Sequence, residues 1–189
     1  DGGNVTFAST NAPILWDYAY TGTNGNTLSL LSTGAITVEQ SIALTGGGSV
    51  QLVAGWDGSS GITGAGSVNL STLRLANNDT ANLTLNASVT GSATSGNLSV
   101  LAAADGAFIN NDATGIITGG GYSALYSTDS ASTSLGSLSP AVVVGTYPSN
   151  LPASFSTNTI VFETYAGSGP TASPISPVLN SSTIQLLSR

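Results

Sequence analysis

The sequence has 189 residues and contains no histidine, no cysteine and no lysine. Without cysteine there is no disulfide framework and no thiolate nucleophile, and without histidine the Ser-His and Cys-His catalytic systems and typical zinc sites are absent. Arg74 and Arg189 are the only cations, and the formal net charge is −7. Nucleic-acid binding needs basic side chains that neutralise phosphates, so the composition comes close to excluding it, and attraction to anionic lipid is equally disfavoured.

Charge and long apolar runs are also scarce. Charged residues make up 6% of the chain, against about 25% in ordinary globular domains. Hydrophobic residues make up 40% and the mean hydropathy is +0.26, which together permit a core and argue against disorder. No stretch approaches the ~18 apolar residues of a membrane helix, so no membrane insertion is expected. The chain starts at Asp1 without a methionine or a signal peptide, and we expect a processed or excised chain.

Between residues 27 and 111 the sequence contains one pattern that is repeated several times. A short segment of alternating apolar residues is followed by a corner of Gly, Asn or Asp, and then by another alternating segment. Alternation with a period of two places one set of side chains inside and the other outside. Segments of three to five residues are too short for ordinary hairpins and suit a β-solenoid, in which each coil stacks on the previous one.

The spacing of the apolar segments predicts where coils begin. Segments start at Leu28, Val50, Val68, Leu83 and Leu98, which are 22, 18, 15 and 15 residues apart. A coil with three short faces needs roughly five residues per face plus corners, which is about this length. The pattern therefore predicts a coil at each start, with extra residues bulging at the corners.

The triplet Asn-Asn-Asp occurs twice, at residues 77–79 and 110–112. Asn and Asp tolerate left-handed backbone and bond their own main chain, so both triplets fit corners, where stacked Asn side chains could form a hydrogen-bonded ladder. The alternative is calcium bound by Asp79 or Asp112. Calcium takes six to eight oxygens, usually from several carboxylates, and each corner offers one carboxylate. We favour the corner interpretation and predict no metal site.

Aromatic residues gather near the start of the chain, at Trp16, Tyr18 and Tyr20. Alternate positions would place all three on one face of a strand. They could form a cross-strand cluster that closes the first coil, or a platform on which a sugar ring stacks. We favour the cluster, because aromatic and β-branched pairs are common on sheets.

Six of the seven prolines lie after residue 139, and proline removes a donor from a strand ladder. We therefore predict N-terminal strands or a cap at 1–26, solenoid repeats at 27–138 and an irregular, proline-containing extension at 139–189. The extension keeps three strand-like pieces, at residues 141–144, 159–165 and 183–187. The last piece either caps the open end of the solenoid or adds to the edge of a neighbouring molecule.

Catalysis would have to come from carboxylates, because nine acidic residues are the only catalytic candidates. Asp57 with Asp79, or Asp79 with Asp105, could align about 4.8 Å apart on successive coils, and a glycosidase needs two carboxyl groups within roughly 5–10 Å. Isolated acids at turns need no such explanation. We predict a non-catalytic protein with no catalytic residue, no cofactor and no metal, and keep a β-helix carbohydrate-active enzyme as the third hypothesis.

Several segments together resemble a known family. Residues 28–38 and 42–54 look like the repeats of filamentous-haemagglutinin-type, two-partner-secreted large exoproteins, and residues 108–115, 122–129 and 135–138 resemble the segment that often closes those repeats. The resemblance implies a right-handed parallel β-helix, secretion through an outer-membrane partner, and a role in adhesion or the extracellular matrix. The chain departs from the family in its short length and in lacking an evident amino-terminal secretion signature.

The expected fold is therefore all-β, a right-handed parallel β-helix with an irregular carboxy-terminal region. The expected function is that of an extracellular structural or adhesive protein at the bacterial cell surface or in the matrix. Its expected partners are further copies of itself, through strand edges or end to end, or a host or cell-surface glycan or protein. The alternative is a subunit of an extracellular filament, joined through the solenoid ends or through strand addition by the carboxy-terminal tail.

Overall fold

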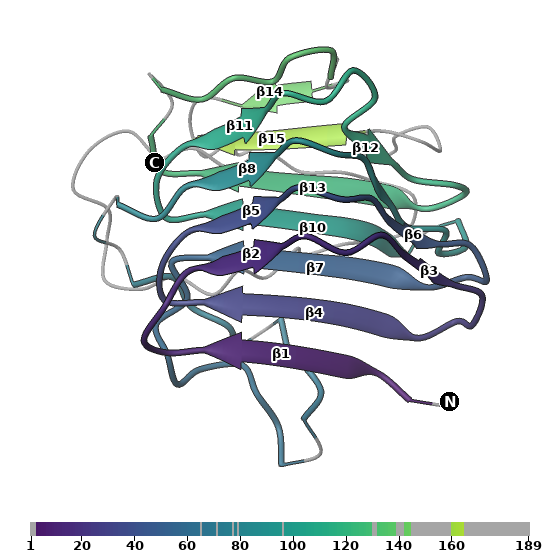
Figure 1. The fold of residues 1–189 in the computed structure, drawn as a ribbon, viewed down its shortest axis with the longest axis horizontal. Helices are drawn as coiled ribbons and strands as arrows, with labels where there is room; N and C mark the ends of the chain where they lie inside the picture. Colours follow the sequence, from purple (N-terminus) through teal and green to yellow (C-terminus); the bar gives the residue numbers. More distant parts are fainter. Residues whose placement is uncertain are drawn as a thin grey trace.

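The protein is described by a computed structural model that covers residues 3–64, 66–70, 72–76, 78, 80–95, 97–129 and 132–138, with the backbone of 142–144 and 160–164. These residues form strands and turns, and none of them belongs to a helix that could cross a membrane. The strands form three parallel sheets, which are the three faces of a β-solenoid of about five stacked turns (Figure 1). The predicted all-β, parallel β-helix fold is confirmed.

Each of the first four coils contributes one strand to each sheet. The long sheet contains, in spatial order, β1 (Val5–Ser9), β4 (Thr27–Ser32), β7 (Ser49–Ala54), β10 (Leu98–Ala104), β13 (Tyr122–Ser127), β15 (Ile160–Thr164) and β14 (Val142–Val144). The second sheet contains β2 (Ile14–Trp16), β5 (Ile36–Val38), β8 (Leu83–Leu85) and β11 (Phe108–Asn110). The third sheet contains β3 (Tyr20–Gly22), β6 (Ile42–Leu44), β9 (Val89–Thr90) and β12 (Ile116–Ile117).

The strand register stacks each inward-facing side chain on its counterpart one coil away. In the long sheet, Leu30 is paired with Phe7 on one side and with Leu52 on the other. In the second sheet, Ile36 is paired in the same way with Ile14 and Leu83. The inward side chains of all three sheets form one continuous core. The short alternating segments of the sequence therefore fill a common interior, as the period-two pattern predicts.

One coil is much longer than the others. Leu28 stacks on Val50, 22 residues later, whereas Val50 stacks on Val100, 50 residues later. The prediction that Val68 begins a coil is therefore wrong. The prediction that Leu83 begins one is also wrong, because Leu83 lies in β8 on the second sheet.

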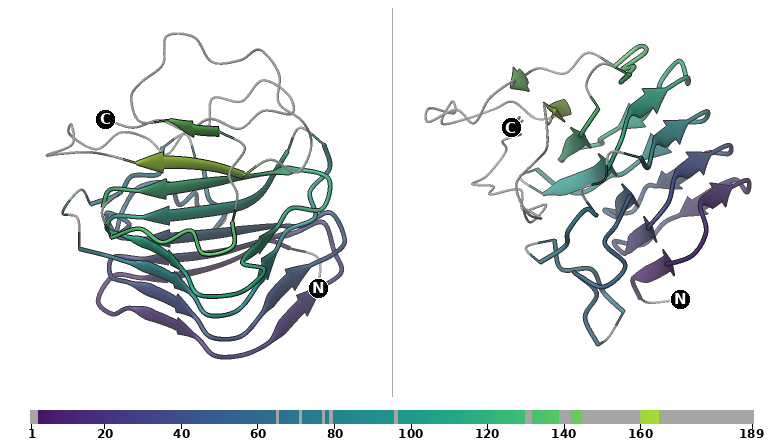
Figure 2. Two further views of the ribbon diagram at one scale, coloured as in Figure 1. Left: turned by 90° about the horizontal axis from the view of Figure 1, so that it is seen from above. Right: turned by 90° about the vertical axis from the view of Figure 1, so that its left-hand side faces the viewer.

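The extra chain in this coil, residues 55–80, is an insert that covers the outer face of the long sheet (Figure 2). Its two arms are joined by isolated antiparallel bridges from Trp56 to Leu75 and from Ile62 to Val68. The buried side chains of the insert pack on outward-facing residues of four long-sheet strands, and this second core contains Leu31, Val53, Trp56, Leu73, Leu75, Leu101, Ala103, Ala124 and Tyr126. The apolar residues between 68 and 75 thus pack outside the solenoid instead of inside it.

A side-chain ladder of the kind considered for the triplets forms at a corner of the solenoid, between the second and third sheets, but mostly from other residues. Asn111 Nδ2 donates to Asn86 Oδ1 at 2.8 Å, and Asn86 Nδ2 donates to Glu39 Oε1 at 2.9 Å. These residues follow β11, β8 and β5, so the ladder runs across three coils. Only Asn111 comes from the two predicted triplets, and Asn77 and Asp79 lie outside the described residues.

The two predicted end segments also have identifiable places. Residues 5–22 of the expected N-terminal segment form β1, β2 and β3, which stack in parallel register on the next coil. Beyond β13, two of the three predicted carboxy-terminal pieces are strands, β14 and β15, and they extend the long sheet. The third piece, residues 183–187, lies outside the described residues.

Replacing Leu73 with alanine tests whether the insert is part of the folded unit. Leu73 is fully buried in the second core, so Leu73→Ala should lower the free energy of unfolding by about 2–5 kcal/mol. Ile62→Ala, at the 37% exposed tip of the same insert, should change it by no more than about 1 kcal/mol. Urea denaturation followed by far-UV circular dichroism measures both, and equal effects would contradict the packing.

The stability of the protein at alkaline pH should depend on Tyr122, which lies in the interior core with 5% of its surface exposed. Burial raises the pKa of its hydroxyl well above the ordinary value of 10.0. In the unfolded chain the hydroxyl ionises near pH 10, whereas in the folded protein it stays neutral. The hydroxyl therefore does not lower the free energy of unfolding below pH 10, and it lowers this free energy increasingly as the pH rises further. Tyr122→Phe should flatten this fall in urea titrations between pH 8 and 11.5. An unchanged fall in Tyr122→Phe would contradict the burial of a neutral hydroxyl.

Candidate functional site

The solenoid is open at its amino-terminal end within the described residues. Each of β1, β2 and β3 pairs with a strand on one side only. Their inward side chains lie at the surface although the same positions one coil later are buried: Phe7 is 50% exposed and its neighbour Leu30 0%, and Tyr20 is 38% exposed and its neighbour Ile42 0%. We call the inward side of β1–β3, with the corner at 23–27, the amino-terminal mouth.

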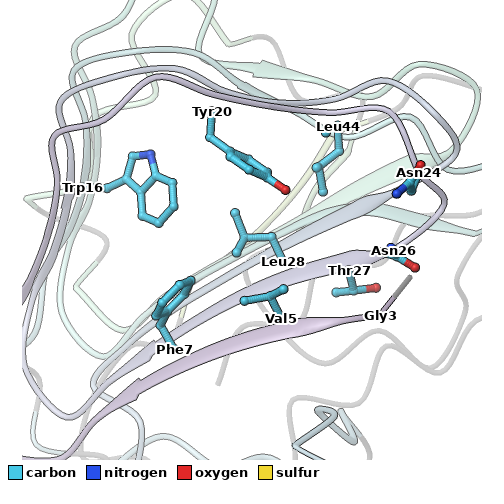
Figure 3. A pocket seen from close by; sticks show the side chains of 11 residues that line it. Gly3, Val5, Phe7, Trp16, Tyr20, Asn24, Asn26, Thr27, Leu28 and Leu44 are labelled. Atoms are coloured by element: carbon cyan, nitrogen blue, oxygen red, sulfur yellow. The ribbon is translucent and has the colours of Figure 1, made fainter. Parts of the chain in front are cut away.

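A cavity of about 300 Å³ lies inside the mouth (Figure 3). Gly22 pairs with Leu44 of the next coil and brings no side chain to the cavity wall, and Leu44, which is 4% exposed, lines the cavity there. The cavity is lined by Gly3, Val5, Phe7, Trp16, Tyr20, Gly22, Asn24, Asn26, Thr27, Leu28 and Leu44. None of these residues is charged, so a ligand here would be held by apolar contact and by hydrogen bonds to neutral groups.

Three aromatic rings form one wall of the cavity. Trp16 meets Phe7 at 6.1 Å between ring centroids with an interplanar angle of 65°, and it meets Tyr20 at 6.3 Å with an angle of 84°. Edge-to-face packing of this kind is a favoured arrangement of aromatic side chains. The rings come from three different strands, so they join all three sheets of the first coil.

The aromatic prediction is thus correct in one respect and wrong in another. Trp16 and Tyr20 do form a cluster in the first coil, with Phe7 as its third member. However, Trp16, Tyr18 and Tyr20 do not share one face of a strand, because β2 ends at Trp16 and β3 begins at Tyr20. Tyr18 lies in the turn between them and is 72% exposed.

A polar rim borders the cavity on the side of the corner at residues 23–27, between β3 and β4. Asn24, Asn26 and Thr27 line it there (Figure 3). The Thr27 N–H donates to Asn4 Oδ1 at 2.8 Å, and the Asn26 carbonyl accepts from the Ser49 N–H at 3.2 Å. The rim is therefore held in place by Asn4, which precedes β1, and by Ser49, the first residue of β7.

The acidic residues considered for catalysis have local structural partners. Asp105 is fully buried, and its Oδ2 accepts from the Asn78 N–H at 2.9 Å, which ties the end of the insert to the corner after β10. Asp57 Oδ1 accepts from the N–H groups of Ser59 and Ser60 at 2.9 and 2.7 Å and closes the first turn of the insert. Asp79 lies outside the described residues. Burial of Asp105 keeps its carboxylate away from any polysaccharide at the surface.

The corner considered for calcium is closed by its own hydrogen bonds. Asp112 Oδ1 accepts from the N–H groups of Thr114 and Gly115 at 2.8 and 2.6 Å, as expected of an Asp that stabilises a turn. Within the described part of the chain, no group of three or more His, Cys, Asp or Glu side chains could hold a metal ion. The corner interpretation of Asp112 agrees with this geometry.

Sequence reasoning missed the mouth, because it depends on which strands pair on one side only and not on a local motif. Val5, Phe7 and Gly22 carry no distinctive motif, and Gly22 becomes informative only once its pairing with Leu44 is known. The usable signal was the aromatic content of residues 7–20, which is out of proportion to the aliphatic repeats that follow.

Two glycine substitutions test the geometry of the mouth. A Cβ on Gly22 would meet the tip of the flexible Leu44 side chain, whereas a Cβ on Gly46, at the corresponding corner of the next coil, would collide with the backbone carbonyl of Thr23. Gly22→Ala should therefore change the free energy of unfolding by less than about 1 kcal/mol, and Gly46→Ala should lower it by more than that. Urea denaturation measures both, and a larger loss for Gly22→Ala would contradict an open mouth.

Comparison with known proteins adds no named relative to this geometry. No protein family, no curated protein and no solved structure matches the chain. The β-solenoid fold therefore rests on the strand register itself.

Proposed function

We propose that the protein is an extracellular structural or adhesive β-solenoid of the bacterial cell surface or matrix, of the filamentous-haemagglutinin type, and that it acts without catalysis. The observation that carries the proposal is the chemistry of two flat outer faces. The strand register lines up one outward side chain per coil on each face. The second sheet presents Leu15, Thr37, Thr84 and Ile109, and the third sheet presents Thr21, Ala43, Thr90 and Ile117.

These columns suit recognition of a neutral surface. They contain no charged side chain, and their members recur at the strand spacing of about 4.8 Å. Threonine offers a hydroxyl that donates and accepts hydrogen bonds beside a methyl group that makes apolar contacts. A partner with regularly spaced hydroxyl groups, such as a cell-surface glycan, fits this combination without requiring ion pairs.

The architecture also suits a structural role outside the cell. Backbone groups of successive coils pair in parallel across all three sheets, so little strand backbone is free for a protease to bind. Strands β4, β7, β10 and β13 of the long sheet are buried on both faces, between the core and the insert. Such a rod keeps its surface columns at fixed positions, which an adhesive surface requires.

Adhesion through the second-sheet face can be tested with charge substitutions. Beads coated with the protein should bind a panel of immobilised cell-surface glycans, and Thr37→Lys with Thr84→Lys should reduce binding about tenfold or more, because two unpaired charges interrupt the neutral column. Thr63→Lys with Thr72→Lys adds the same charge on the exposed insert and is the matched control. Equal binding of both double variants, or no binding by the native protein, would contradict the proposal.

The open amino-terminal mouth favours a second candidate, a filament subunit joined through the solenoid ends. Unpaired strand edges are templates for addition of another chain, and the edges of β1–β3 come with exposed apolar side chains. Negative-stain electron microscopy with a mass measurement in solution separates the candidates. Filaments with a regular repeat support the filament subunit, and isolated rods of monomer mass contradict it.

A further inference from the structure

We propose that the amino-terminal mouth is the docking site of the chain's own carboxy-terminal segment, residues 183–188, which adds to β1 as a parallel strand. The proposal goes beyond adhesion and competes with end-to-end association, because a filled mouth cannot receive a second molecule. Four independent observations support it: the sequence of the segment, the register of the long sheet, the cavity, and the length of the connecting chain.

The sequence of the segment repeats that of a long-sheet strand. Residues 183–188 read TIQLLS, and β4 reads TLSLLS, so the two are identical at four of six positions. Strand β7 reads SVQLVA and shares the polar residue flanked by aliphatic ones. The segment therefore has the pattern of a strand that stacks in the long sheet, although it lies outside the described residues.

Register gives each side chain of the segment a matching neighbour on β1. In the long sheet, one inner column runs through Val5 and Leu28 and a second through Phe7 and Leu30. If the segment aligns on β1 as β1 aligns on β4, Ile184 continues the first inner column and Leu186 the second.

The outer column between these two is polar and offers a further match. It runs through Thr6, Ser29 and Gln51, and Ser29 Oγ donates to Gln51 Oε1 at 2.9 Å inside the protein. In the same alignment Gln185 falls beside Thr6. A glutamine, Gln51, already occupies this column three strands away, on β7, so a second one fits its hydrogen-bonding pattern.

The cavity explains why the segment would bind at this edge of the sheet. Val5 and Phe7 line the cavity and are 44% and 50% exposed. An added strand would cover both side chains, and its inward aliphatic groups would enter a space of about 300 Å³ that now has no side chain in it. Burial of this apolar surface is the driving force for docking.

The connecting chain is long enough to reach. The long sheet has the order β1-β4-β7-β10-β13-β15, so the position beyond β1 lies six strand spacings from β15, which is about 29 Å. A parallel strand also begins at the opposite end from that at which β15 ends, about 17 Å back along the strand, so the linker must span about 33 Å. The eighteen residues from 165 to 182 span up to roughly 60 Å when extended and about 23 Å on average when flexible. The required span lies between these two lengths, so the linker can reach the mouth of its own molecule.

Disulfide trapping provides the test, because the chain has no native cysteine. The full-length variant with Thr6→Cys and Gln185→Cys should form an intramolecular disulfide under mild oxidation, at least about tenfold faster than the control pair Thr90→Cys with Gln185→Cys on the third sheet. A third pair, Val143→Cys with Gln185→Cys, probes the opposite edge of the long sheet at β14. Peptide mapping and non-reducing gels identify each product.

The outcomes separate this proposal from the others. A monomeric 6–185 disulfide supports docking in the mouth. A ladder of intermolecular 6–185 disulfides overturns it and supports the filament candidate, and preferential 143–185 trapping overturns it in favour of the other edge. Failure of all three pairs to react also overturns it, while leaving the adhesion assay unaffected.

A measurement without cysteine guards against misfolding of the variants. In the Trp56→Phe variant, Trp16 is the only tryptophan, and it lies in the wall of the mouth. Deleting residues 183–189 should raise acrylamide quenching of Trp16 at least about twofold, and Gln185→Ala, with the segment retained, should leave it near the full-length value. Unchanged quenching on deletion would overturn the proposal.

Discussion

In this protein each inward-facing side chain packs on its counterpart one coil away, because parallel strands in register place equivalent residues about 4.8 Å apart. The core, the corners and the outer faces all depend on that register. It stacks Phe7, Leu30 and Leu52 inside the long sheet, and it aligns Glu39, Asn86 and Asn111 into a ladder at a corner. The same repetition makes the amino-terminal end of the solenoid different from its middle, since within the described residues β1, β2 and β3 have a neighbouring strand on one side only.

The insert is the other organising feature, and it acts on the outside of the solenoid. A long-sheet strand without the insert would expose outward residues such as Leu31, Val53 and Leu101, which are buried beneath it. The second and third sheets have no such cover in the described structure and carry threonine and aliphatic side chains outward, none of them charged. The molecule therefore has one closed face and two faces able to contact a partner, which is why the adhesive proposal is placed on the latter two.

The sequence was sufficient to predict the fold class but not the position of every coil. Alternation at residues 28–31, 36–38 and 50–53 predicted strands correctly, because each segment buries one face in the core. Residues 68–75 show a similar apolar pattern and yet lie on the outer face, since periodicity reports that side chains are buried and not against which surface. The mouth was not predictable either, because it depends on β1, β2 and β3 having a neighbouring strand on one side only within the described residues, which is a relation between coils.

The whole arrangement of coils depends on the strand register across the insert, which pairs Thr37 with Thr84 although 47 residues separate them. Spin labels on Thr37→Cys and Thr84→Cys in the otherwise cysteine-free chain measure it by continuous-wave electron paramagnetic resonance. Adjacent strands predict backbones about 4.8 Å apart and strong dipolar broadening relative to the two singly labelled proteins. If residues 68–75 formed a coil of their own, the labelled strands would be about 9.6 Å apart, and markedly weaker broadening would contradict the structure.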